Sequence, residues 1–201
     1  MKRRHCVAAA LLAAAALTVF AQGVQGTLAD EADIARLRLR ALQIPVVSVQ
    51  PSELQDSYLQ ARGGGLRSHE ALDIMARRGT PVVAVEDGHI AKMFLSRPGG
   101  LTVYHFDDAR EFSYYYAHLD RYVDGLREGM RVQKGQVIGY VGSTGNAAPA
   151  SPHLHFAIFR LGPERQWWRG TPINPFRVWS ARPDAGAGDR PISEFVSVPS
   201  R

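Results

Sequence analysis

The chain has 201 residues, 45% of them hydrophobic, and a formal net charge of +5. This length suits one soluble domain with a full hydrophobic core. One cysteine excludes an internal disulfide, and the basic residues do not form the clustered pattern typical of a nucleic-acid-binding face.

Residues 1–21 have the pattern of an export signal. A basic start, Lys2 to Arg4, precedes an apolar run that ends at a small residue, Ala21. We expect cleavage after Ala21, with Gly26 as the second candidate and an uncleaved inner-membrane anchor as the alternative. The segment holds the cysteine, three of the 24 basic residues and no acid, so 21 basic and 19 acidic residues remain, a net charge of +2. Any zinc site in the mature chain must then use histidine and carboxylate ligands.

Residues 22–50 are expected to form an N-terminal extension. From Gly26 to Gln43 acidic side chains precede basic ones, which favours a helix through its dipole. The alternation of arginine and leucine from Arg36 to Arg40 also fits a strand. The β-branched stretch from Ile44 to Val49 predicts a strand.

Residues 51–180 predict a mainly β domain. Gly63 to Gly65 predict a flexible loop just before His69. After Asp73, short apolar runs alternate with turn residues, which is typical of an antiparallel sheet. The expected strands lie in Pro81 to Val85, Ile90 to Leu95, Leu101 to Phe106, Phe112 to Leu119, Val137 to Val141 and Leu154 to Phe159. Residues 181–201 are rich in Pro, Gly, Asp and Ser and predict a disordered tail.

Four histidines and one aspartate stand in short motifs that indicate a metal site: His69, Asp73, His118, His153 and His155. Catalytic zinc takes three protein ligands and keeps a position open for water, so this set supplies three ligands and two further histidines. In a strand, residues two apart share a face, so His153 and His155 should project into one groove. By the same parity Tyr116 should lie in the groove beside His118, and the loop that holds Asn146 should flank it. His89 and His105 lie outside the motifs, and we expect exposed positions for both.

The ordered motifs H-E-A-L-D, R-G-T-P-V-V-A-V-E-D-G, Y-Y-A-H-L, V-Q-K-G-Q-V-I-G-Y-V-G-S-T-G and P-H-L-H-F resemble the lysostaphin/LytM-type zinc metalloendopeptidases, which cut peptidoglycan peptides. The resemblance covers Leu66 to Phe159 and continues in T-P-I-N-P. It implies a twisted antiparallel sheet of the duplicated hybrid motif type, with an open groove. The loops that would form its rims are Gly63 to Arg67, Asp107 to Glu111 and Ser143 to Ser151. The segment from Leu28 to Leu42 is the one placed to cover that groove.

The same resemblance implies the role of each site residue. His69, Asp73 and His155 would bind one zinc ion, and His118 and His153 would be the catalytic pair, with either as the general base. The chain departs from the family at Ala71, where glycine is usual. If that position needs a positive φ, alanine would be strained there by about 1 kcal/mol.

The resemblance predicts an exported, zinc-dependent endopeptidase that hydrolyses peptidoglycan cross-links, in the periplasm or secreted. One alternative is a catalytically silent domain of this fold that binds cell wall or activates an amidase. Another is a zinc peptidase that acts on proteins. The expected partner is a peptidoglycan peptide, without nucleic acid and without a membrane after signal cleavage. The sequence carries no signal for an oligomeric state or for which wall bond is cut.

Overall fold

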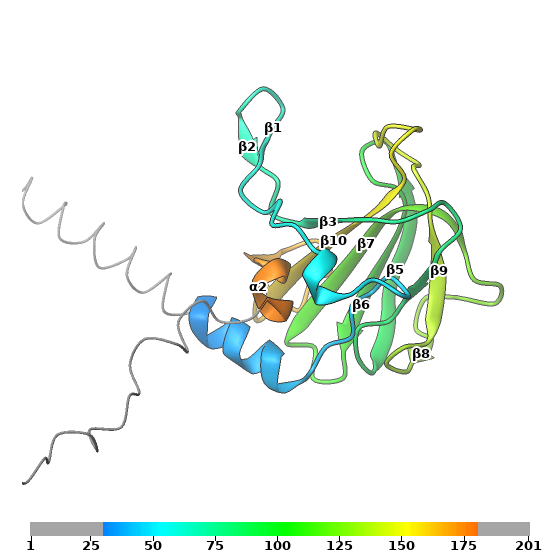
Figure 1. Ribbon diagram of the computed structural model, residues 1–201. Helices are drawn as coiled ribbons and strands as arrows, with labels where there is room; N and C mark the ends of the chain where they lie inside the picture. The colour runs from blue at the N-terminus through cyan, green and yellow to red at the C-terminus, as the bar shows by residue number, and fades with distance from the viewer. Residues whose placement is uncertain (1–29, 181–201) are drawn as a thin grey trace, which may run out of the picture.

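The computed structural model describes residues 30–180 (Figure 1). The proposed signal and its cleavage sites, the start of the extension and the tail after residue 180 lie outside the described residues. Within residues 30–180, no helix is long and apolar enough to cross a membrane.

A nine-stranded sheet forms the body of the molecule, and all its strand pairs are antiparallel. Its main path runs β11-β10-β7-β6-β5-β8, while β3 pairs with β10 and β9 pairs with both β4 and β7. The bounds are β3 Leu72–Met75, β4 Pro81–Val83, β5 Gly88–Ser96, β6 Gly100–Asp107, β7 Phe112–Tyr122, β8 Arg131–Val132, β9 Val137–Val141, β10 His153–Leu161 and β11 Gly170–Ile173. The predicted mainly β, antiparallel fold is confirmed.

A separate two-stranded hairpin stands at one end of the sheet, formed by β1 (Ala61–Arg62) and β2 (Arg67–Ser68) (Figure 1). The predicted glycine loop closes it. Gly63, Gly64 and Gly65 all have positive φ values, a conformation that residues with a Cβ adopt at a cost. The glycines therefore set the register that places Arg62 opposite Arg67.

Two helical segments pack beside one another at the edge of the sheet. Residues 30–39 are helical, as the charge asymmetry predicts, and α2 (Pro175–Trp179) follows Asn174, whose side chain accepts from the Phe176 N–H. Arg38 joins them by donating to the carbonyl of Arg177 at 2.6 and 3.0 Å. A single helical turn, η1 (Pro51–Glu53), precedes the hairpin.

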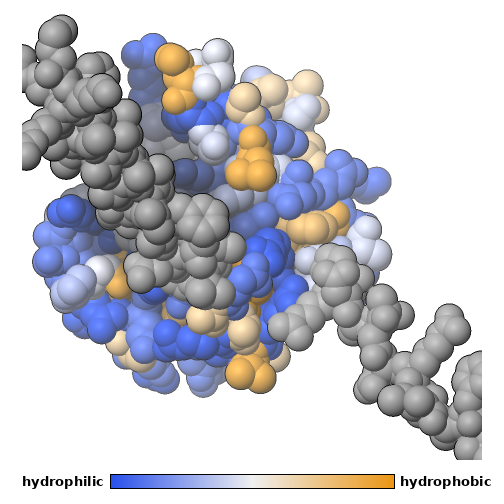
Figure 2. Space-filling model, turned by 90° about the vertical axis from the view of Figure 1, so that its left-hand side faces the viewer, coloured by the Kyte–Doolittle hydropathy of each residue, from blue (hydrophilic) through white to orange (hydrophobic). Residues whose placement is uncertain are grey.

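The hydrophobic core includes residues on both sides of the expected boundary at residue 50. Ile34, Leu37 and Val46 belong to the same buried cluster as Tyr114 and Phe156. The described part of the N-terminal segment therefore packs as one body with the sheet. On the visible part of the face in Figure 2, hydrophobic residues stand as separate spots in a mainly hydrophilic surface.

The strand expected from Ile44 to Val49 does not form. Only Val46 makes an isolated bridge, to Val82, and the chain then turns with Ser48 at φ 69°. Burial explains Val46, which is 1% exposed, but not Val47, which is 38% exposed. A β-branched residue that packs in the core without regular ladder partners does not form a strand.

Candidate active site

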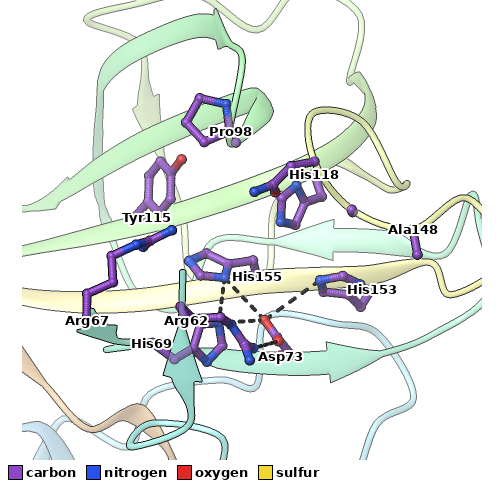
Figure 3. Close-up of a pocket in the computed structure, with 13 residues that line it drawn as sticks. Arg62, Arg67, His69, Asp73, Pro98, Tyr115, His118, Ala148, His153 and His155 are labelled. Atoms are coloured by element: carbon purple, nitrogen blue, oxygen red, sulfur yellow. Dashed lines mark hydrogen bonds and ion pairs between the residues drawn. The ribbon is translucent and has the colours of Figure 1, made fainter. Parts of the chain in front are cut away.

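A groove of about 460 Å³ lies across β3, β7 and β10, next to the β1-β2 hairpin (Figure 3). All five residues of the histidine and aspartate set line it: His69, Asp73, His118, His153 and His155. Asn146 lines it as well, on the loop that follows β9. None of residues 30–50 lines the groove, so the described part of the segment expected to cover it lies elsewhere.

His69, Asp73 and His155 converge on one point at the edge of the sheet. Asp73 in β3 and His155 in β10 are direct cross-strand partners, and His69 lies just after β2. His69 Nε2 lies 3.0 Å from His155 Nδ1 and 3.1 Å from Asp73 Oδ1, and His155 Nδ1 lies 3.2 Å from Asp73 Oδ1. Three side chains from separate segments thus present one ligand atom each.

These separations suit a tetrahedral zinc ion. Ligand atoms held at 2.0–2.1 Å from a tetrahedral centre are about 3.3 Å apart, close to the three distances observed. Two imidazoles and one carboxylate are a ligand set typical of catalytic zinc, with a fourth position left for water. The residues therefore fit the metal that the sequence predicts.

Ser57 holds two of these ligands, although the sequence did not indicate it. Its carbonyl lies 3.0 Å from His69 Nδ1, so that nitrogen must donate and Nε2 keeps its lone pair for a metal. Its hydroxyl lies 3.0 Å from the Asp73 N–H, from which it accepts, and 3.3 Å from the Ala71 carbonyl, to which it donates. Ser57 is 5% exposed and belongs to no motif, so a single sequence gives no signal for it.

Arg62 contacts the other oxygen of the aspartate. Its guanidinium donates to Asp73 Oδ2 at 2.9 Å, which leaves Oδ1 directed at the two histidines. Burial opposes ionisation of Asp73, but the adjacent His155 and His69 side chains outweigh burial and lower the pKa of the carboxyl. Burial also lowers the pKa of His155, against the raising effect of Asp73. Both shifts favour the protonation states that bind metal.

His118 and His153 face the same groove with matching tautomers. Nδ1 of His118 lies 2.8 Å from the carbonyl of Thr144, and Nδ1 of His153 lies 2.8 Å from the carbonyl of Ser151. Each Nδ1 therefore donates, and in the neutral form of either ring Nε2 carries the lone pair. The two rings lie 5.0 Å apart, and burial lowers the pKa of His118 to about 4 despite the opposing Thr144 hydrogen bond. His118 is thus a neutral imidazole at pH 7.

The prediction that Tyr116 lies in the groove is wrong. Tyr116 is fully buried, and its hydroxyl contacts the Val85 N–H and His105 Nδ1, whereas Tyr115 lines the groove. Between the pairs Leu101–Leu119 and Val103–Tyr116, one residue of β6 opposes two of β7, a bulge that contains His118 at φ 61°. The extra residue reverses the parity between positions 116 and 118.

Two smaller expectations also need correction. Positive φ occurs at Glu70, with φ 56°, and not at Ala71, so the alanine is not strained by its backbone. His105 is not exposed but fully buried, and burial lowers its pKa to about 3.

Comparison with known proteins connects this geometry to a family. Residues 67–175, more than half of the chain, match peptidase family M23. The chain is 36% identical over 125 residues to the L-Ala--D-Glu endopeptidase of Bacillus subtilis, an alignment that covers 59% of this chain and 38% of that protein. It is 34% identical over 99 residues to the peptidoglycan DD-endopeptidase ShyC of Vibrio cholerae, with 49% of this chain and 22% of that protein covered. The chain thus spans well under half of these relatives.

Solved structures show the same fold. The catalytic domain of lysostaphin from Staphylococcus simulans superposes with a TM-score of 0.52 and 28% identity, over 63% of this chain and 90% of that domain. A putative glycyl-glycine endopeptidase lytM from Ruminococcus gnavus gives a TM-score of 0.53 and 30% identity, over 63% of this chain and 52% of that one. The sequence match and the shared fold agree with the resemblance seen in the motifs, and the chain belongs to peptidase family M23.

Proposed function

We propose that the chain is an exported zinc-dependent endopeptidase that hydrolyses peptide cross-links of peptidoglycan. The observation that carries this proposal is the joint placement of a His-Asp-His ligand set and two further histidines in one groove. The N-terminal signal pattern supports export, and the named activities of the relatives support the substrate class.

His69 Nε2, Asp73 Oδ1 and His155 Nδ1 would hold the zinc ion. When bound, zinc polarises the scissile carbonyl and acidifies water in the open position. Ser57 and Arg62 keep the ligand atoms in place through the contacts described above.

His118 and His153 would transfer the proton of the attacking water and stabilise the charge that develops on the substrate. His118, neutral at pH 7 and fixed by Thr144, would accept the proton of the attacking water at Nε2 and then donate it to the leaving amine nitrogen as the C–N bond breaks. His153, fixed by Ser151, lies across the groove floor with Nε2 3.7 Å from Asp73 Oδ1. In its protonated form His153 would donate from Nε2 to the oxygen that becomes negative in the tetrahedral intermediate.

A catalytically silent domain or a peptidase that acts on proteins gains no specific support. All five site residues are present and converge, whereas a silent domain has no need for a complete set. The name of the Vibrio cholerae relative specifies peptidoglycan as its substrate, which favours a wall peptide over a protein substrate.

The direct test is digestion of purified cell wall, followed by separation of the muropeptides. We expect the protein with zinc to release peptides from cross-linked wall, and the products to name the bond that is cut. A chelator and His155→Ala should abolish release, while His89→Ala, outside the groove, should retain it. Undiminished release by the chelated protein would refute the zinc mechanism. Cleavage of protein substrates alone would support the alternative of a zinc peptidase that acts on proteins.

A further inference from the structure

Two arginines stand side by side at one end of the groove. Arg62 and Arg67 are direct cross-strand partners in the β1-β2 hairpin, and both line the groove (Figure 3). Like charges in directly opposite positions destabilise a strand pair. A two-residue strand pair closed by three glycines has little stability with which to offset this repulsion.

The two arginines differ in their partners. Arg62 donates to Asp73 Oδ2 at 2.9 Å and to Gln60 Oε1 at 3.1 Å, so its charge is already compensated. Arg67 is exposed and extends toward Tyr115 across the groove. Among the ion pairs of residues 30–180, none includes Arg67. One guanidinium is therefore available to a ligand in the groove.

The other end of the groove has a different character. Asn146, Ala147 and Ala148 line it and carry no charge, and Figure 3 shows Ala148 on the side of His153. The groove is thus cationic at the hairpin end and neutral at the end formed by the loop after β9. A ligand that spans both ends fits best with an anionic group on one side of the reacting carbonyl and small, uncharged groups on the other.

We propose that Arg67 forms a subsite for a carboxylate of the substrate peptide. This inference rests on the proposed function and adds the substrate class to it: peptides with a free carboxyl group near the scissile bond, in preference to amidated peptides or glycine bridges. A guanidinium fork pairs with a planar carboxylate through two parallel hydrogen bonds, which a carboxamide cannot reproduce.

The test compares two versions of one cross-linked muropeptide, with its D-glutamate and diaminopimelate carboxyl groups either free or converted to carboxamides. Both cleavage (kcat/KM) and equilibrium binding (Kd) are measured on the full chain with zinc. We expect the wild-type protein to favour the free acid by about tenfold or more in both quantities. Arg67→Gln should bring the ratio close to one, and added salt should reduce the wild-type ratio. Arg127→Gln, an exposed arginine outside the groove, should leave the ratio unchanged.

The outcomes separate this inference from the proposed function. Cleavage of both peptides with equal efficiency, or an acid preference that survives Arg67→Gln, would overturn the subsite while leaving the peptidase intact. If neither peptide is cleaved, the proposed function fails for this substrate, and the Kd ratio still decides whether Arg67 recognises carboxylate.

Discussion

At the residue scale, the regular parts of the site follow from the sequence and the irregular parts do not. His153 and His155 share the groove because β10 is a regular strand, so a period of two predicts their common face. Tyr116 fails the same rule because a bulge intervenes, and no residue type marks that bulge in the sequence. Ser57 and Arg62 act through hydrogen bonds to motif residues, and such partners are apparent only in three dimensions.

A substitution at Ser57 tests whether the hydrogen-bond partners of the proposed ligands affect zinc binding. Ser57→Ala removes the hydroxyl that accepts from the Asp73 N–H but keeps the carbonyl that orients His69. We expect zinc affinity, measured by competition with a chelator, to fall about 10–100-fold, because supporting contacts of metal ligands have effects of this size. Ser52→Ala, at an exposed position, should retain wild-type affinity, and an equal affinity in both variants would show that Ser57 does not position the ligands.

His105 predicts how stability depends on pH. Its pKa is lowered from 6.5 to about 3 by burial, so below pH 6.5 the unfolded chain binds a proton that the folded chain does not. The free energy of unfolding should therefore fall by about 1.4 kcal/mol for each pH unit between roughly 6 and 4 because of this group. Urea unfolding at several pH values should show a slope shallower by that amount in His105→Gln. Parallel pH profiles for the two proteins would contradict the buried, neutral state of His105.

At the element scale, the N-terminal helix is joined to the sheet by a cluster of charges. Arg40 contacts Glu86 and Asp107 at 3.1 and 3.0 Å, and its guanidinium lies 4.9 Å from the centre of the Phe112 ring. The expected rim role of Asp107 to Glu111 is not seen, because among residues 30–180 the groove lining includes none of them. The helix itself was predictable from its charge asymmetry. Its position against the sheet depends on Glu86 and Glu111, which lie 46 and 71 residues from Arg40 and which no local pattern indicates.

Arg40→Met should therefore destabilise the fold without affecting the groove. It leaves Asp107, with a side chain 3% exposed, without its guanidinium partner, and we expect a loss of about 2 kcal/mol in the free energy of unfolding. Arg177→Met breaks an exposed pair with Glu31 and should cost less than about 1 kcal/mol. Chemical denaturation measures both, and equal losses would show that the burial of Asp107 does not decide the effect.

At the scale of the whole molecule, one antiparallel sheet brings together motifs that are far apart in the chain. The pairing of β10 with β3 and β7 places His155 beside Asp73 and Ala117, and thereby assembles a groove from segments up to 82 residues apart. The sequence predicts this fold class, because turn residues divide the chain into short apolar runs. The strand order and the packing of Ile34 and Leu37 into the core depend on long-range contacts that no local pattern encodes.

The central claim is that the five groove residues divide into three zinc ligands and two residues that act on the substrate. Zinc content per chain, measured for the wild type, His155→Ala and His118→Ala after equal exposure to zinc, tests it most directly. We expect about one zinc per chain in the wild type and in His118→Ala, and a large loss in His155→Ala. Equal zinc content in the two variants, or retention in His155→Ala alone, would contradict the division.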